Sequence, residues 1–192
     1  EPDEKTIEYV KSKTPDLFTP IKSDTDAEYS RVINIDVTNM PPQIACPDAV
    51  DNVKPVSELG DIELDQIYLG SCTNGRIEDL QQAANIIQGK KINPRTRLVV
   101  VPASQEIFVT AMNKGLIQIF VESGAAIATA SCGACYGGHL GILASGETCL
   151  STTNRNFIGR MGDPKSKLYL GSPSVAAASA LTGRITDPSN LR

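Results

Sequence analysis

Three cysteines in two separate motifs are the residues of this 192-residue chain whose types and spacing could do chemistry. Cys72 lies in the stretch Gly-Ser-Cys-Thr-Asn-Gly over 70–75, and Cys132 and Cys135 form a C-x-x-C motif further along. Small neighbours would let the backbone come close to a bulky group. Thiolates are soft ligands that select zinc, copper(I) or iron-sulfur clusters. The pattern therefore predicts a metal centre or a thiol pair.

The spacing alone leaves the occupant of this centre open. A zinc ion would need a fourth ligand, for which only His139 is available. An electron-transfer cluster would need four thiolates at ferredoxin-like spacings, which the sequence lacks. Three thiolates on a cubane would leave one iron open, and that iron could polarise a substrate hydroxyl as a Lewis acid. A non-catalytic zinc module and a redox dithiol are the alternatives from other classes.

Two arginines in a polar loop could bind an anionic ligand. Arg155 and Arg160 lie five residues apart among Asn and Gly residues, after an expected strand. This setting suits bidentate binding of carboxylates. Taken without the cysteines, the pair would more often be surface arginines with salt-bridge partners. Beside an open Lewis-acidic iron, anion-binding arginines form a consistent site.

The segments around these motifs alternate between short apolar runs and amphipathic helices. We expect strands over 29–37, 67–70, 97–101, 125–130, 148–152 and 167–170, and helices over 4–13, 76–88, 105–114, 116–122 and 173–181. Because most apolar runs are continuous, they predict a mainly parallel sheet covered on both faces, a three-layer α/β/α fold. Ligands of such sheets bind beyond the carboxyl ends of the strands, where both cysteine motifs fall.

The composition is that of a globular domain of ordinary size. We expect residues 1–26 to be a lead-in or interdomain linker and residues 27–192 to be the α/β domain, with an irregular, proline-marked crossing over 41–60. The chain begins without Met, so we expect it to be a piece of a longer one.

Several classes of function are disfavoured. The net charge of -4, with both signs interspersed, argues against a nucleic-acid surface. No apolar run reaches the roughly 18 residues of a membrane span, and the start has no signal-peptide pattern. An odd number of cysteines, without a glycosylation acceptor, does not fit a secreted disulfide framework. We expect a cytoplasmic protein that binds neither nucleic acid nor membrane.

Together, the motifs resemble the iron-sulfur domain of the aconitase family. The likeness rests on Gly-Ser-Cys-Thr-Asn, on the C-x-x-C motif, on Gly-Glu-x-Cys-x-Ser-Thr-x-Asn-Arg-Asn-Phe-x-Gly-Arg over 146–160 and on the closing segment over 172–183. It covers about residues 1–190 in order. Within the family, the chain is most similar to large subunits of isopropylmalate dehydratases, in leucine biosynthesis, and to the related homoaconitases, especially the archaeal-type chains.

The resemblance implies a 4Fe-4S cluster ligated by Cys72, Cys132 and Cys135, with one iron not ligated by protein. That iron would be open to the hydroxyl and carboxylate of a hydroxy polycarboxylate substrate, and the implied reaction is dehydration followed by rehydration. A helix starting near Asn74 would direct its free N-H groups at the anionic cluster.

The resemblance further implies that Arg155 and Arg160 face the substrate and that Asn154 hydrogen-bonds near the cluster. A general base is not evident in the chain. We expect further catalytic residues from other domains and from a small, swivelling-domain subunit, so that this chain is the carboxy-terminal part of a large subunit and is inactive alone.

The two other cysteines match no ligand position of the family. We expect Cys149 and Cys46 to be buried small hydrophobes. We expect His139 to be a structural residue or one that supports the site from behind the ligands.

Overall fold

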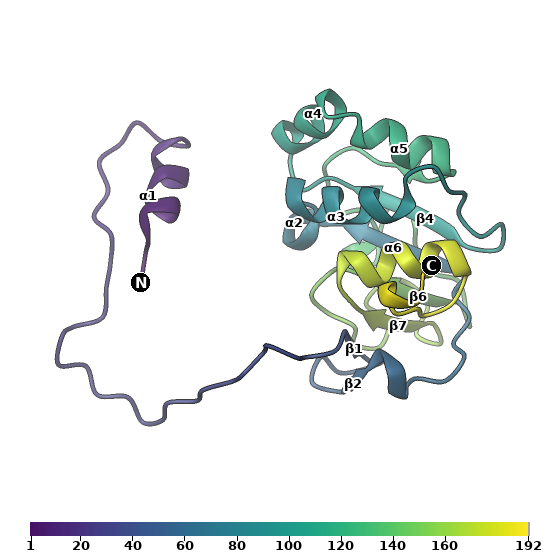
Figure 1. Cartoon of the computed structure of the whole chain (residues 1–192), viewed down its shortest axis with the longest axis horizontal. Helices are drawn as coiled ribbons and strands as arrows, with labels where there is room; N and C mark the ends of the chain where they lie inside the picture. Colours follow the sequence, from purple (N-terminus) through teal and green to yellow (C-terminus); the bar gives the residue numbers. More distant parts are fainter. Residues whose placement is uncertain (192) are drawn as a thin grey trace. The chain divides into compact units, whose positions relative to one another are not determined.

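The computed structural model describes residues 1–191, and the chain forms two units, Glu1–Met40 and Pro41–Arg192 (Figure 1). The first unit contains α1 (Glu4–Lys11), which begins where the Asp3 side chain accepts a hydrogen bond from the Thr6 backbone N-H at 2.8 Å. No residue of α1 is buried. The helix expected over 4–13 is confirmed, and it spans Glu4–Lys11.

The strand expected over 29–37 is wrong. Residues 12–40, all of them described, contain no helix or strand, and Ile33, Ile35 and Val37 are each more than 60% exposed. Alternation of apolar residues makes a strand only where a neighbouring strand takes up the backbone hydrogen bonds, and none does so here. Residues 27–40 thus lie outside the compact second unit, and the assignment of 27–192 to one cluster-binding domain stays a prediction.

The second unit is built on a seven-stranded sheet with strand order β2-β1-β7-β6-β3-β4-β5. The strands are β1 (Gln43–Ala45), β2 (Val53–Pro55), β3 (Gln66–Gly70), β4 (Arg97–Val101), β5 (Ala126–Ile127), β6 (Thr148–Ser151) and β7 (Lys167–Leu170). The last five are parallel to one another, and β1 runs antiparallel to β2 and β7. The expected α/β fold with a mainly parallel sheet is confirmed. The irregular crossing expected over 41–60 is wrong in part, because β1 and β2 form an antiparallel pair within it.

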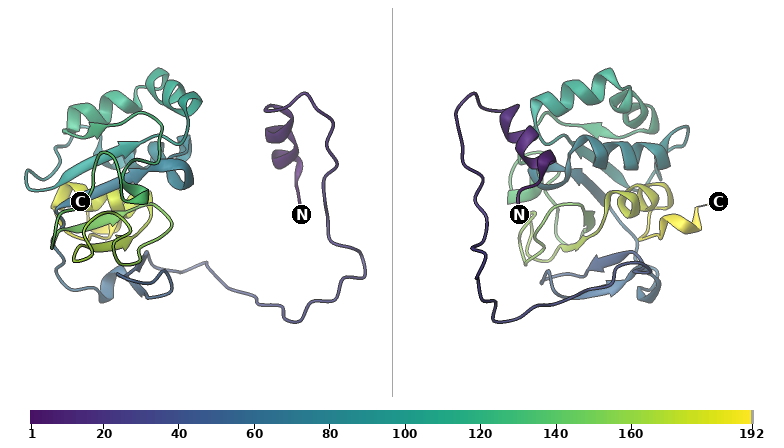
Figure 2. Two further views of the ribbon diagram at one scale, coloured as in Figure 1. Left: turned by 180° about the vertical axis from the view of Figure 1, so that it is seen from behind. Right: turned by 60° about the vertical axis from the view of Figure 1, so that its left-hand side comes forward.

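Helices cover one face of this sheet. They are α3 (Ile77–Ile87), α4 (Gln105–Asn113), α5 (Leu116–Ser123) and α6 (Pro173–Thr182), while α2 (Ser71–Asn74) is a single turn. Apolar residues of α3 to α6 form one core with Ile67, Leu69, Leu98 and Val100 of the central strands. In the right-hand view of Figure 2 these helices lie on one side of the strands, and the green loops lie on the other.

The second face of the sheet is covered by loops. Because neighbouring strand residues point to opposite faces, Tyr68, Val99 and Cys149 turn away from the helices. They pack against Ala134 and Cys135 in the short 3-10 helix η2 (Gly133–Tyr136) and against other loop residues. This layer therefore carries the C-x-x-C motif, where sequence patterning predicted α-helices on both faces.

Local sequence explains where the helices begin and end. Ser172 caps α6 by accepting from the Val175 N-H at 3.3 Å, Pro173 occupies its first turn, and Gly183 ends it with φ 79°. Ser104 caps α4 in the same way. Within residues 1–191 no helix has the length and apolar character needed to span a bilayer.

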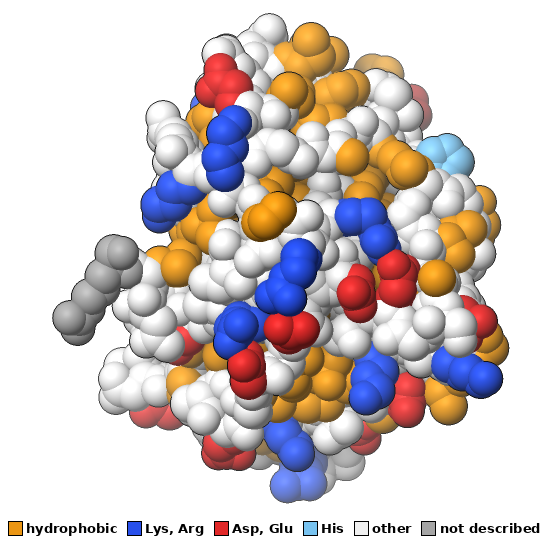
Figure 3. Space-filling model, turned by 90° about the vertical axis from the view of Figure 1, so that its right-hand side faces the viewer, with side chains coloured by type: hydrophobic (Ala, Val, Ile, Leu, Met, Phe, Trp, Pro, Cys, Tyr) orange, Lys and Arg blue, Asp and Glu red, His pale blue; other side chains and the backbone are white. Residues whose placement is uncertain are grey.

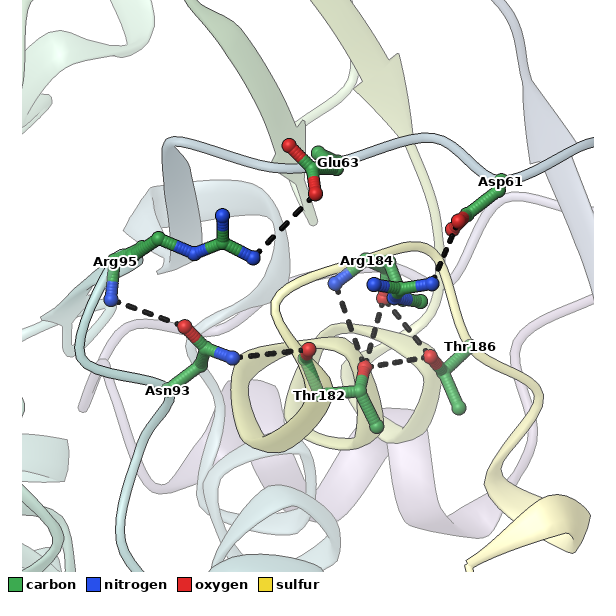
Figure 4. Close-up of polar contacts among 7 residues, drawn as sticks. All are labelled: Asp61, Glu63, Asn93, Arg95, Thr182, Arg184 and Thr186. Carbon is green, nitrogen blue, oxygen red and sulfur yellow. Dashed lines mark hydrogen bonds and ion pairs between the residues drawn. The ribbon is translucent and has the colours of Figure 1, made fainter.

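Polar contacts fasten the carboxyl end of α6 to the segments that lead into β3 and β4 (Figure 4). Arg184 pairs with Asp61 at 2.6 Å, and the Asn93 side chain donates to the Thr182 carbonyl oxygen at 3.0 Å. Both contacts lie at the amino ends of the strands, opposite the cysteine motifs. On the face drawn in Figure 3, basic and acidic side chains lie side by side and form no patch of one sign.

Candidate functional site

Cys72 is placed by a sharp turn at the carboxyl end of β3. Gly70 has φ 116°, and a Cβ there would clash with the Val101 backbone of β4, so only glycine fits. Ser71 follows in the left-handed region with φ 68°, which is costly for a residue with a side chain. The turn presents Cys72 as an exposed thiol beyond the strand end. Its predicted place at a strand end is confirmed.

Cys132 is the N-cap of η2, and Cys135 lies within that 3-10 helix. The Cys135 backbone N-H donates to the Cys132 carbonyl oxygen at 3.0 Å. The Cys132 thiol is exposed, whereas Cys135 is buried with 6% of its surface accessible. The motif thus offers one thiol to solvent and holds the other against the sheet.

Tyr68 joins the two cysteine motifs. It lies on β3, four residues before Cys72, and its phenol donates to the Cys132 carbonyl oxygen at 3.0 Å. Burial raises the pKa of Tyr68 well above its usual range, with the neighbouring Cys135 adding to the shift, so the hydroxyl stays a donor. This contact ties the C-x-x-C loop directly to the strand that leads to Cys72.

Arg160 is brought to the cysteines. Its Nη2 donates to the Cys135 Sγ at 3.5 Å, and its guanidinium lies 5.4 Å from the centre of the Phe157 ring. Asn154 and Arg155, from the same loop, are exposed. In the described part of the chain, Arg155 forms no ion pair, and it lines a cavity of about 540 Å³. Of the predicted loop residues, only Arg160 contacts a cysteine.

Asn156 is a site residue that sequence reasoning missed. It is 1% exposed, and its Nδ2 donates to the carbonyl oxygens of Cys46 at 2.6 Å and Ala49 at 3.3 Å. The backbone carbonyl oxygen of Asn156 accepts from the Asp48 N-H at 3.2 Å. These bonds fix the loop of residues 152–160, which carries Arg155 and Arg160 and is called the arginine loop below, on the turn between β1 and β2. The only signal in the sequence was the second Asn of the Asn-Arg-Asn stretch.

The thiols of Cys72, Cys132 and Cys135 are soft donors, the kind that binds zinc or an iron-sulfur cluster. Within residues 1–191, no three His, Cys, Asp or Glu side chains gather closely enough to hold one metal ion, which a zinc site requires. The cysteines of a cubane bind different irons, so their sulfurs need not meet at one point. His139, the possible fourth zinc ligand, is exposed and has φ 67°.

Unpartnered buried polar atoms mark the same place. In the part of the chain that the structure describes, four buried side-chain atoms have no hydrogen-bond partner: Ser71 Oγ, Asn74 Oδ1, Asn156 Oδ1 and Arg160 Nε. All four belong to the cysteine stretch over 70–75 or to the arginine loop. Buried polar atoms are normally paired. Ser71 Oγ and Arg160 Nε are donors and fit an anionic group, whereas Asn74 Oδ1 and Asn156 Oδ1 are acceptors and would need a donor.

The comparison with known families agrees with these motifs. The model of the Aconitase family (aconitate hydratase) matches residues 52–183, which include both cysteine motifs and the arginine loop. The chain belongs to the aconitase family. The resemblance predicted from the motifs is confirmed.

Curated relatives of this aconitase-family chain carry one name. The 3-isopropylmalate dehydratase large subunits of Syntrophus aciditrophicus and Sulfurihydrogenibium sp. are 54% and 51% identical to it over 191 residues. Large subunit 1 of Pyrococcus furiosus is 52% identical over 193 residues. The matches cover the whole chain but only 46%, 44% and 46% of these relatives. The chain thus spans less than half their length.

The two remaining cysteines of the aconitase-family chain lie inside the protein. Cys149, on β6, is fully buried, and burial raises the pKa of its thiol to about 12. Cys46 is 8% exposed, in the helix-side core. Both are free thiols. The prediction that they are buried small hydrophobes is confirmed.

Proposed function

We propose that this chain is the cluster-bearing part of a hydro-lyase of the 3-isopropylmalate dehydratase type. Such an enzyme moves a hydroxyl between neighbouring carbons of a hydroxy polycarboxylate by dehydration and rehydration. The observation that carries the proposal is that all four unpartnered buried side-chain atoms of the described chain belong to residues of the cysteine stretch over 70–75 or of the arginine loop. Family membership and the names of the relatives support it.

Cys72, Cys132 and Cys135 would hold a 4Fe-4S cluster, with one iron left without a protein ligand. When bound, the cluster would supply a Lewis-acidic iron for the substrate hydroxyl and carboxylate. The protein contributes the exposed thiols of Cys72 and Cys132 and the buried thiol of Cys135. Apolar packing around Cys135 would keep water from that side of the cluster.

The two arginines would have different roles, Arg160 at both the Cys135 thiolate and the substrate, and Arg155 at the substrate alone. Arg160 donates to the Cys135 sulfur, so its charge would stabilise a thiolate ligand as well as a substrate carboxylate. Arg155, exposed beside its cavity, would bind a carboxylate bidentately. Asn154, exposed in the same loop, would hydrogen-bond near the cluster.

Other parts of a longer protein would complete the site. Large apolar side chains are exposed on the loops that carry the motifs: Tyr136, Leu140, Ile142, Phe157 and Ile158. Apolar surface of this extent beside a polar site fits a face that another domain or subunit covers. Since the relatives are large subunits, that partner would include a small subunit. The general base would come from outside this chain.

A homoaconitase reaction is the near alternative, because it uses the same site chemistry on a related substrate. The names of the relatives favour 3-isopropylmalate. A zinc module is less well supported, because it needs ligands gathered around one ion.

The test is an assay of the complete large subunit bearing this sequence, assembled anaerobically with its small subunit. We expect 3-isopropylmalate to yield the unsaturated acid, followed by its ultraviolet absorbance. Arg155→Lys should lower kcat/KM by about 10- to 100-fold through loss of a charge-assisted, bidentate contact. Arg184→Lys, at the opposite end of the strands, is the matched control. Equal activity of the Arg155 variant and this control would overturn the role given to Arg155. Activity with homoaconitate only, or no activity of the wild type, would overturn the assignment.

A further inference from the structure

The C-x-x-C loop has few polar links to the rest of the protein. Within the described chain, two side chains join residues 129–139 to other segments. Arg160 donates to the Cys135 sulfur, and the Tyr68 phenol donates to the Cys132 carbonyl oxygen and also interacts with the Ala134 backbone. Only Tyr68 holds the backbone of the loop.

Tyr68 is a rigid anchor for that backbone. It lies in β3, which pairs with β4 on one side and β6 on the other, and none of its surface is exposed. The next residue of the loop, Gly133, sits directly on the phenol, where a Cβ would clash with the Tyr68 hydroxyl. The loop is therefore fitted to this ring and to its oxygen.

The same strand carries the first cysteine motif. Cys72 is the fourth residue after Tyr68, along β3 and its turn. A bond from Tyr68 to the backbone of Cys132 therefore fixes one motif relative to the other. A phenylalanine would fill the same space without supplying this bond.

We propose that Tyr68 is a positioning residue that holds the C-x-x-C loop in register with Cys72, and so sets how firmly the site retains its cluster. The inference rests on the proposed function where it concerns the cluster. The claim that Tyr68 holds the C-x-x-C loop in place rests only on the contacts of Tyr68 and does not depend on the proposed function.

The test compares Tyr68→Phe with Tyr169→Phe, since Tyr169 is a largely buried tyrosine of β7 that packs in the core on the helix side. In the metal-free full chain, alkylation of buried Cys135 is followed by peptide mass spectrometry, with exposed Cys72 and buried Cys149 as internal references. Losing one neutral hydrogen bond should speed alkylation of Cys135 by about fivefold, which corresponds to about 1 kcal/mol. Cys72 and Cys149 should react at unchanged rates, because the rest of the fold stays closed.

After anaerobic reconstitution with iron and sulfide, release of iron to a chelator gives the second readout. We expect release from Tyr68→Phe to be several-fold faster than from the wild type, and release from Tyr169→Phe to match the wild type. Equal Cys135 alkylation in both variants would overturn the role of Tyr68 in the loop. Faster alkylation with unchanged iron release would overturn its role in retaining the cluster. A wild-type chain that binds no iron would overturn the proposed function instead, and the alkylation result would still decide the loop.

Discussion

The guanidinium of Arg160 donates a hydrogen bond to the sulfur of Cys135 at 3.5 Å and so joins the arginine loop to the C-x-x-C loop. Arg155, five residues earlier, is exposed and reaches no cysteine. The two arginines therefore differ in what they touch, although the motif presents them as a pair. This difference makes their variants separable by experiment.

Arg160→Lys should impair both iron retention and turnover. Lysine keeps the charge but loses the planar fork, so the contact with the Cys135 sulfur and the stacking on Phe157 are both weakened. We expect iron to leave the reconstituted chain several-fold faster and kcat/KM of the assembled enzyme to fall about 10- to 100-fold. Arg155→Lys should lower kcat/KM and leave iron release unchanged. If both variants release iron at the wild-type rate, Arg160 does not support the cluster.

The five thiols of the metal-free chain should fall into two groups. Cys72 and Cys132 are exposed and should react with a thiol reagent at once, whereas Cys46, Cys135 and Cys149 are buried and should react slowly until the protein unfolds. The pKa of Cys149 is raised to about 12 by burial, so this thiol is protonated at neutral pH. Titration with and without denaturant measures the two groups. Five fast thiols in the folded chain would contradict the placement of the cysteines.

Asn156→Ala should destabilise the fold. It removes the donor that pairs with the buried carbonyl oxygens of Cys46 and Ala49 and releases the arginine loop from the β1–β2 turn. We expect the free energy of unfolding to fall by about 1–3 kcal/mol, measured by urea denaturation. Asn154→Ala, two residues away and exposed, should change it by less than about 0.5 kcal/mol. Equal effects of the two variants would show that Asn156 is no anchor.

Glu147 should contribute stability that acid removes. Burial alone would raise the pKa of this carboxyl, but the Ala144 N-H and the Arg97 guanidinium, 2.8 Å away, together hold it below its usual range. A lowered pKa means that the contribution is present above the unfolded value of about 4.3 and is lost as the pH falls through the folded value. Glu147→Gln should therefore melt below the wild type at pH 7, and the difference should shrink below about pH 4. A difference in melting temperature that is independent of pH would contradict this.

Local pattern was sufficient to predict the parallel part of the sheet. Continuous apolar runs mark β3 and β4, and caps such as Ser172 and Gly183 mark the ends of α6. Pattern was not sufficient where pairing over a distance decides. Ile33 and its neighbours alternate as a strand would, but no strand lies beside them within the described chain. The short β1 and β2 form only because they pair with each other and with β7.

The features of the candidate site also fall into those that local sequence predicts and those that depend on contacts between distant residues. From the motifs we predict a role for Cys72, Cys132, Cys135 and the two arginines, and the structure confirms that the cysteine motifs follow strands. The motifs could not predict that Tyr68 reaches the backbone of Cys132 or that Asn156 is bonded to the β1–β2 turn. Both contacts join residues far apart in the sequence, and their partners are backbone carbonyl groups, which leave no mark on residue type.

The most direct test of the account is the iron content of the chain after anaerobic reconstitution with iron and sulfide. We predict about four irons per chain, lost when Cys72, Cys132 or Cys135 is replaced by serine and kept when buried Cys149 is replaced by alanine. Stoichiometric zinc in place of iron, or iron binding that does not depend on Cys72, would contradict the cluster site proposed here.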